Sequence, residues 1–128
     1  MFMRKCFAMA VRAIPVLAIL GCFACNRDPG LPPPLAVDQI PAEFQKAFGT
    51  AQSEIKDLAL QVSSAVQTND YSAAFASVQA LCNASGTTKE QSLLAARAML
   101  AINGLLQTAQ SKGDEQAAET LKVYQRSK

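Results

Sequence analysis

Apolar residues recur at intervals of three and four from residue 38 to the end of the chain, which is the spacing of amphipathic helices. It predicts helices near 40–48, 55–66, 71–82 and about 88–111, and a last helix that starts after residue 114. The residues expected to face the core are Ile40, Phe44, Ala47, Phe48, Ile55, Leu58, Ala59, Val62, Ala65, Val66, Tyr71, Ala74, Phe75, Val78, Leu81, Cys82, Ala117, Ala118, Leu121 and Tyr124. No segment alternates with period two for long enough to form a strand. We therefore expect an all-α fold, a small bundle of four to five helices arranged as hairpins.

Polar residues suited to helix capping stand at the predicted helix boundaries. Asp70 and Asp114 are predicted N-caps of the third and the last helix. Two overlapping capping boxes precede the long helix: Thr87-x-x-Glu90 and Thr88-x-x-Gln91. The long helix is apolar or small over most of its circumference, so we expect it to lie centrally, with neighbours on more than one side.

A weak internal repeat appears when the chain is shifted by 44 residues, which places 70–74 on 114–118. Each unit would be a long helix, a short polar turn and a shorter returning helix. The segments 69–74 (NDYSAA) and 113–118 (GDEQAA) resemble the Gly-Asp-Tyr-x-x-Ala start of the second helix in tetratricopeptide repeats. The 44-residue spacing differs from the 34 residues of that family, and two units are fewer than the three that a solenoid normally needs. We therefore expect packed hairpins rather than a true repeat array.

The N-terminal residues have the charge and hydropathy pattern of an export signal. Residues 1–12 carry Arg4, Lys5 and Arg12 and no acid, and the next twelve residues, 13–24, are apolar (AIPVLAILGCFA). That run is too short to span a bilayer, which takes roughly 20 residues. A buried core helix is the competing interpretation, but the position behind basic residues and ahead of a proline-rich stretch argues against it.

The end of this apolar run resembles the lipobox of bacterial lipoproteins. Ile19-Leu20-Gly21-Cys22 fits it at the first, third and fourth positions, and Cys22-Phe23-Ala24-Cys25 fits only at the last two. The resemblance implies that 1–21 is a signal peptide and that Cys22 carries acyl chains that insert into the lipid bilayer. Cleavage at 24/25 with lipid on Cys25 is the alternative, and a secreted protein cut near Ala24 is a further one. Neither cysteine is followed by Asp, which in many Gram-negative bacteria marks retention at the inner membrane. The expected location is therefore the periplasmic face of the outer membrane.

A proline-rich stretch separates the cysteines from the predicted helices. Residues 26–37 (NRDPGLPPPLAV) hold four of the six prolines, so they favour extended polyproline II geometry. At about 3.1 Å per residue they could hold the domain up to roughly 37 Å from the bilayer. We therefore divide the mature chain into a lipidated N-terminus and linker, 22–37, and a helical domain, 38–128. A proline-rich ligand for a partner's groove is the alternative interpretation of this stretch.

Composition excludes several kinds of chemistry. The chain has no histidine, which rules out a histidine base, a histidine-containing metal site and a Ser-His-Asp triad. The formal net charge is +2, and loss of the three basic leader residues leaves nine basic against ten acidic residues, a net charge of −1. A near-neutral chain lacks the basic surface that nucleic acid requires. We expect no cofactor, no metal and no enzymatic activity.

Few residues stand out as candidates for binding. Arg97 is the lone guanidinium on the predicted long helix, where it would snorkel to the surface, pair with an acid of a neighbouring helix, or recognise an anion. Tyr71 and Tyr124 could line a groove, although their helical spacing makes them core or rim residues first. Cys82 is expected to be a small buried hydrophobe, with a bridge to Cys25 as the alternative. These features favour a non-catalytic module that contacts another envelope protein or itself; the alternative is a small-molecule or lipid binder with a cavity in the bundle.

Overall fold

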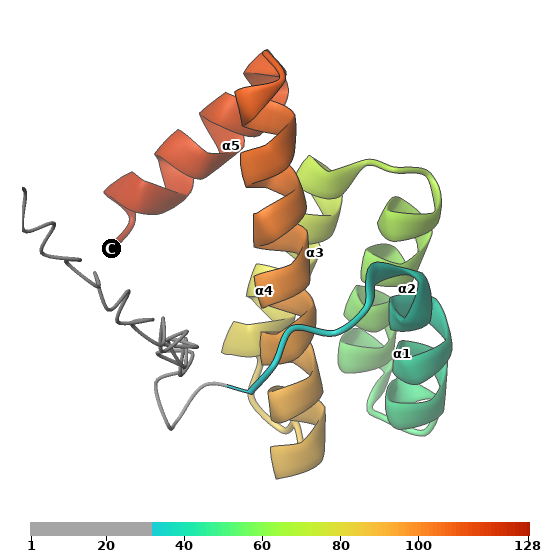
Figure 1. Ribbon diagram of the computed structural model, residues 1–128. Helices are drawn as coiled ribbons and strands as arrows, with labels where there is room; N and C mark the ends of the chain where they lie inside the picture. Colours follow the sequence, from blue (N-terminus) through green and yellow to red (C-terminus); the bar gives the residue numbers. More distant parts are fainter. Residues whose placement is uncertain (1–31) are drawn as a thin grey trace, which may run out of the picture. The chain divides into compact units, whose positions relative to one another are not determined.

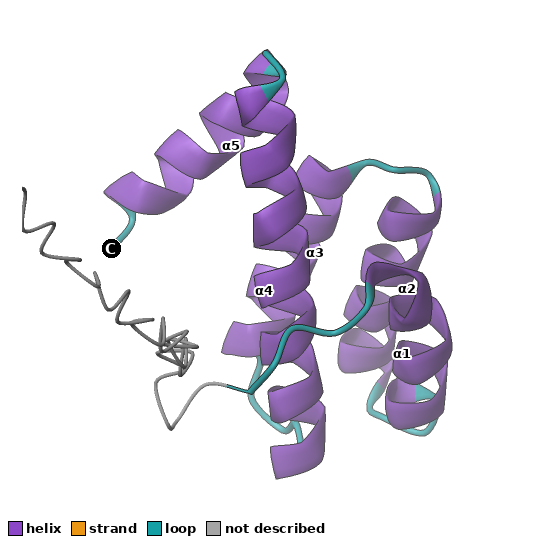
Figure 2. Cartoon of the chain, viewed as in Figure 1, coloured by secondary structure: helices purple, strands orange, loops and turns teal. Residues whose placement is uncertain are grey.

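The computed structural model describes residues 32–128, which form five α-helices preceded by one turn of 3-10 helix and contain no strand (Figure 2). The elements are η1 (Val37–Gln39), α1 (Ile40–Phe48), α2 (Ser53–Gln67), α3 (Tyr71–Asn83), α4 (Lys89–Ser111) and α5 (Glu115–Arg126). The predicted all-α class is confirmed, as are the five predicted helices. The predicted signal peptide and the two candidate lipidation sites lie outside the described residues.

The 23-residue helix α4 is the central element of the helical unit. It packs against α3 and α1 and continues through a tight turn into α5, while α2 lies between α1 and α3 (Figure 1). Helix α5 leaves the C-terminal end of α4 at an angle and reaches back to α3. The expectation that the long helix has neighbours on more than one side is confirmed.

The core of residues 32–128 is built only from apolar side chains, and it contains no buried polar or charged residue. The largest fully buried side chains are Phe44, Phe48, Phe75, Ile40, Leu81, Ile102, Leu106, Val62 and Val78. The alanines that face them on α4, Ala95, Ala98 and Ala101, are also buried. Because an alanine carries a single methyl group, α4 can approach its neighbours closely along this face.

The prediction that Cys82 belongs to the core is wrong, because this residue is exposed. Ala74, Val78 and Leu81 form the buried centre of the inner face of α3, and Phe75 and Cys82 lie two turns apart along one edge of it. Tyr124 of α5 covers that edge at Phe75, with the ring centroids 5.0 Å apart. Because α5 diverges from the bundle, the position of Cys82 is left open to solvent.

The two hairpin turns share one hydrogen-bonding pattern at the 44-residue spacing found in the sequence. Asn69 and Gly113 adopt the left-handed backbone conformation, with φ of 56° and 92°. Each turn has the two backbone hydrogen bonds of a Schellman motif: Asp70 N–H to Ala65 O and Asn69 N–H to Val66 O in the first, and Asp114 N–H to Ala109 O and Gly113 N–H to Gln110 O in the second. The two aspartates then cap the returning helices, accepting from the N–H groups of Ala73 and Ala117. Both predicted N-caps are confirmed.

Replacement of either capping aspartate by alanine is expected to lower the free energy of unfolding by about 1 kcal/mol, because one N-terminal N–H group of the helix loses its acceptor. Urea denaturation of Asp70→Ala and of Asp114→Ala measures this loss. Asp70→Asn keeps the acceptor and should remain close to the original stability. Asp57→Ala, at an exposed site in the second turn of α2, is the matched control. Equal midpoints for Asp70→Ala and Asp57→Ala would contradict the assigned caps.

Candidate functional site

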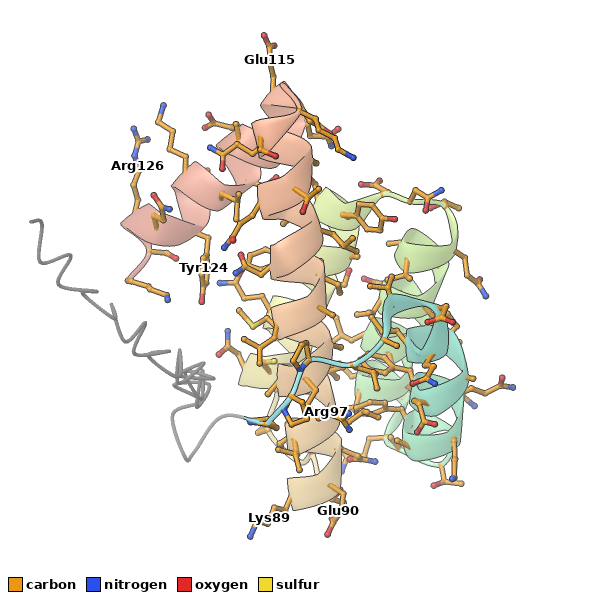
Figure 3. The ribbon with its side chains drawn as sticks, viewed as in Figure 1. Lys89, Glu90, Arg97, Glu115, Tyr124 and Arg126 are labelled. Atoms are coloured by element: carbon orange, nitrogen blue, oxygen red, sulfur yellow. The ribbon has the colours of Figure 1, made fainter. Side chains whose placement is uncertain are left out.

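Arg97 holds the end of the proline-rich linker against α4. Its Nε donates a hydrogen bond to the carbonyl oxygen of Pro33 at 3.0 Å, and its own carbonyl accepts from the N–H of Leu35 at 3.2 Å. Figure 3 shows Arg97 where the chain crosses the front of α4. The sequence predicted that the guanidinium snorkels to the surface, pairs with an acid of a neighbouring helix or binds an anion. In the structure its hydrogen-bond partner is a backbone carbonyl. The Arg97 side chain thus joins two parts of the chain 64 residues apart.

Residues 33–36, which we call the strap, belong to the folded unit although the sequence assigned them to the linker. Leu35 is only 5% exposed and is part of the hydrophobic core. Ala36 has φ of −63° and ψ of 131°, the extended geometry expected for the proline-rich stretch. Burial of Leu35 contributes about 2 kcal/mol. The folded unit therefore begins before residue 38, because an apolar side chain and two hydrogen bonds fasten the strap.

The two candidate tyrosines lie at different surface hollows, and neither hollow includes Arg97. Tyr71 is half-buried, and its hydroxyl donates to Oδ1 of Asn69 at 2.9 Å in the α2–α3 turn. Tyr124 packs edge-on against Phe75, and the Nζ atom of Lys128 lies 4.7 Å from its ring centroid. The structure does not bring the three predicted contact residues together into one site.

A hollow of about 490 Å³ lies between α4 and α5 and is open to solvent. Its lining residues are Asn103, Gln107, Gln110, Leu121, Tyr124, Gln125 and Lys128. Carboxamide side chains dominate this surface, and each has both donors and acceptors, so it can pair with neutral polar groups. From the sequence, Tyr124 is a candidate contact and Leu121 a core residue. The polar positions 103, 107 and 110 on α4 follow the i, i+4, i+7 spacing of one helix face, which is the signal that could have located this surface.

The described residues contain no group of three or more His, Cys, Asp or Glu side chains that could hold a metal ion. None of the helices in residues 32–128 combines the length and the apolar character needed to cross a bilayer. Comparison of the chain with protein-family models, with curated proteins and with solved structures finds no match.

Cys82 is exposed as a residue, but partial burial of its thiol raises the pKa. Its Sγ lies 3.9 Å from Sδ of Met99 on α4. A higher pKa leaves less thiolate at pH 8, and the thiolate is the nucleophile. We therefore expect slower alkylation by iodoacetamide in the folded chain than in the urea-unfolded chain, with the rate–pH curve displaced to higher pH.

The measurement uses a chain in which Cys6, Cys22 and Cys25 are serine, so that only Cys82 reacts. Met99→Ala is a companion variant, because loss of its side chain exposes the thiol and should move the curve back towards that of the unfolded chain. Coincident curves for the folded and unfolded chains would contradict the expected shift.

Proposed function

We propose that this chain is a bacterial envelope lipoprotein, anchored at the periplasmic face of the outer membrane through acyl chains on Cys22. The order of the sequence features supports this proposal: a basic start, a 12-residue apolar run, a cysteine and then a proline-rich stretch. One structural observation adds to it. The described end of the proline-rich stretch, residues 32–37, leads directly into the helical unit and is held there by Arg97, as the end of a tether to a folded domain would be.

The anchored domain, in this proposal, is a non-catalytic module that binds another envelope protein or a second copy of itself. Its described part has an apolar core and helical hairpins whose outer faces are polar apart from single exposed apolar residues. Helical faces of this kind recognise partner segments through a few apolar anchors.

The intact mass of the membrane-extracted protein tests the anchoring. We expect the mass of a chain that begins at residue 22 or 25 and carries diacylglycerol and an N-terminal acyl group. Extraction should require detergent, because several acyl chains bind a bilayer far more firmly than one. An unmodified product recovered in the soluble fraction would refute the lipoprotein proposal.

A second candidate function is the binding of a small polar molecule or a lipid. The hollow between α4 and α5 favours it, since about 490 Å³ falls within the size range of small-molecule sites. The purified protein separates the two candidates. A small molecule that co-purifies and is seen by native mass spectrometry would favour the binder, and crosslinking in cells to one envelope protein would favour the interaction module.

A further inference from the structure

The strap has the features of a peptide bound to the helical unit. Its backbone is extended, its one apolar anchor, Leu35, is buried, and its flanking residues Pro34 and Ala36 are exposed. Its main chain makes two contacts with Arg97, both just before the Leu35 side chain: the Leu35 N–H donates to the Arg97 carbonyl, and the Pro33 carbonyl accepts from the guanidinium. A buried side chain next to main-chain hydrogen bonds is how extended segments are commonly recognised by proteins.

The strap is also the part of the core with the fewest attachments. One buried side chain and two hydrogen bonds hold it, whereas α1 to α4 each contribute at least three buried side chains. Segments with few buried contacts open locally without unfolding the rest of a domain. Release of the strap would uncover a leucine-sized apolar site beside Arg97 and leave the Arg97 Nε–H without its acceptor.

We propose that the surface beneath the strap is the partner-binding site of the domain and that the strap occupies it as an intramolecular competitor. The partner is an extended protein segment with a leucine in the place of Leu35 and a free carbonyl two residues before it. This proposal rests on the proposed interaction function and names its site. The partner can have any residue between the leucine and that carbonyl, because Pro34, which holds this position in the strap, is exposed.

The test adds the strap sequence in trans. The probe is a capped peptide of residues 32–37, PPPLAV, and the protein is the full chain in mild detergent, as purified and as the Leu35→Ala variant. Leu35→Ala empties the leucine site but keeps the chain connected, so the peptide should bind to it and shift the NMR signals of the Arg97 side chain and the Ile40 amide.

Binding to the original chain should be at least about tenfold weaker, because the competent state is populated only when the strap is open. A control peptide with aspartate in place of leucine should bind neither protein. Equal binding to the two proteins, or no binding to a folded Leu35→Ala variant, would overturn the proposal.

Hydrogen exchange in the original chain provides a second measurement that does not depend on the variant's folding. The Leu35 amide should exchange at least about 100-fold faster than the amide of Ile102, which lies at the centre of the core. Equal rates would mean that the strap opens only when the domain unfolds, and the proposal would be wrong. Both measurements use purified protein without a bilayer, so they are independent of the anchoring. The strap proposal can fail while the intact mass still agrees with a lipidated N-terminus, and the anchoring proposal can fail while both strap measurements agree with expectation.

Discussion

Replacement of Cys22 by serine is expected to move the protein from the membrane fraction to the soluble fraction. Serine has no thiol to carry diacylglycerol, so no acyl chain is attached at residue 22. In the lipoprotein proposal, the variant then loses the free energy of several buried acyl chains, about 0.8 kcal/mol for each CH₂ group. Fractionation of cells followed by intact mass measures the outcome.

Cys25→Ser is the matched control, because it lies three residues away in the same junction and should leave the protein membrane-bound. The opposite pattern, in which only Cys25→Ser becomes soluble, would assign the lipid to Cys25 and the cleavage to 24/25. Membrane association unchanged in both single variants and in the double variant would contradict the lipoprotein assignment.

Truncation of Phe75 to alanine is expected to lower the free energy of unfolding by about 3–5 kcal/mol, the range for large buried aromatic side chains. Phe75 is 2% exposed and packs edge-on against Tyr124, so its loss leaves a cavity where α3 meets α5. A domain of this size has a total stability of roughly 5–15 kcal/mol. The melting temperature should therefore fall by more than about 10 °C.

Val123→Ala is the control for this prediction, because Val123 is an apolar residue of α5 that is 56% exposed. Its stability change should stay within about 0.5 kcal/mol. Phe75→Leu retains most of the buried volume and should fall between the two. A loss for Phe75→Ala no larger than that for Val123→Ala would show that α5 does not cover α3 as described.

The local features of the fold could be predicted because they depend on residues close together in the chain. Apolar spacing located the helices, and Asp70 and Asp114 were recognised as N-caps from their neighbours alone. The 44-residue repeat also corresponds to a real likeness, since the two turns share their hydrogen bonds. Each of these interactions spans five residues or fewer, and the side chains that make them are visible in the sequence.

Other features could not be predicted because two distant parts of the chain decide them. Either capping box could have begun α4, and the structure uses Thr88 with Gln91. The Nε2 of Gln91 also donates to the carbonyl of Ala47 at the end of α1, 44 residues away, which adds a tertiary contact to this choice. No local pattern distinguishes the two boxes.

By itself the sequence determined the helices, the aspartate caps of α3 and α5 and the absence of histidine chemistry, since these depend on spacing and composition. The tertiary structure alone decided which residues of an apolar stripe are covered. Phe75 and Cys82 share one edge of α3, and only Phe75 lies beneath α5. It also decided that the strap is part of the domain, because the partners of Leu35 and Pro33 are both supplied by Arg97, more than 60 residues further along the chain. Burial depends on the path of a neighbouring helix, and attachment of the strap depends on which carbonyl meets which donor. Both are contacts between distant parts of the chain, and the pattern along the sequence does not specify them.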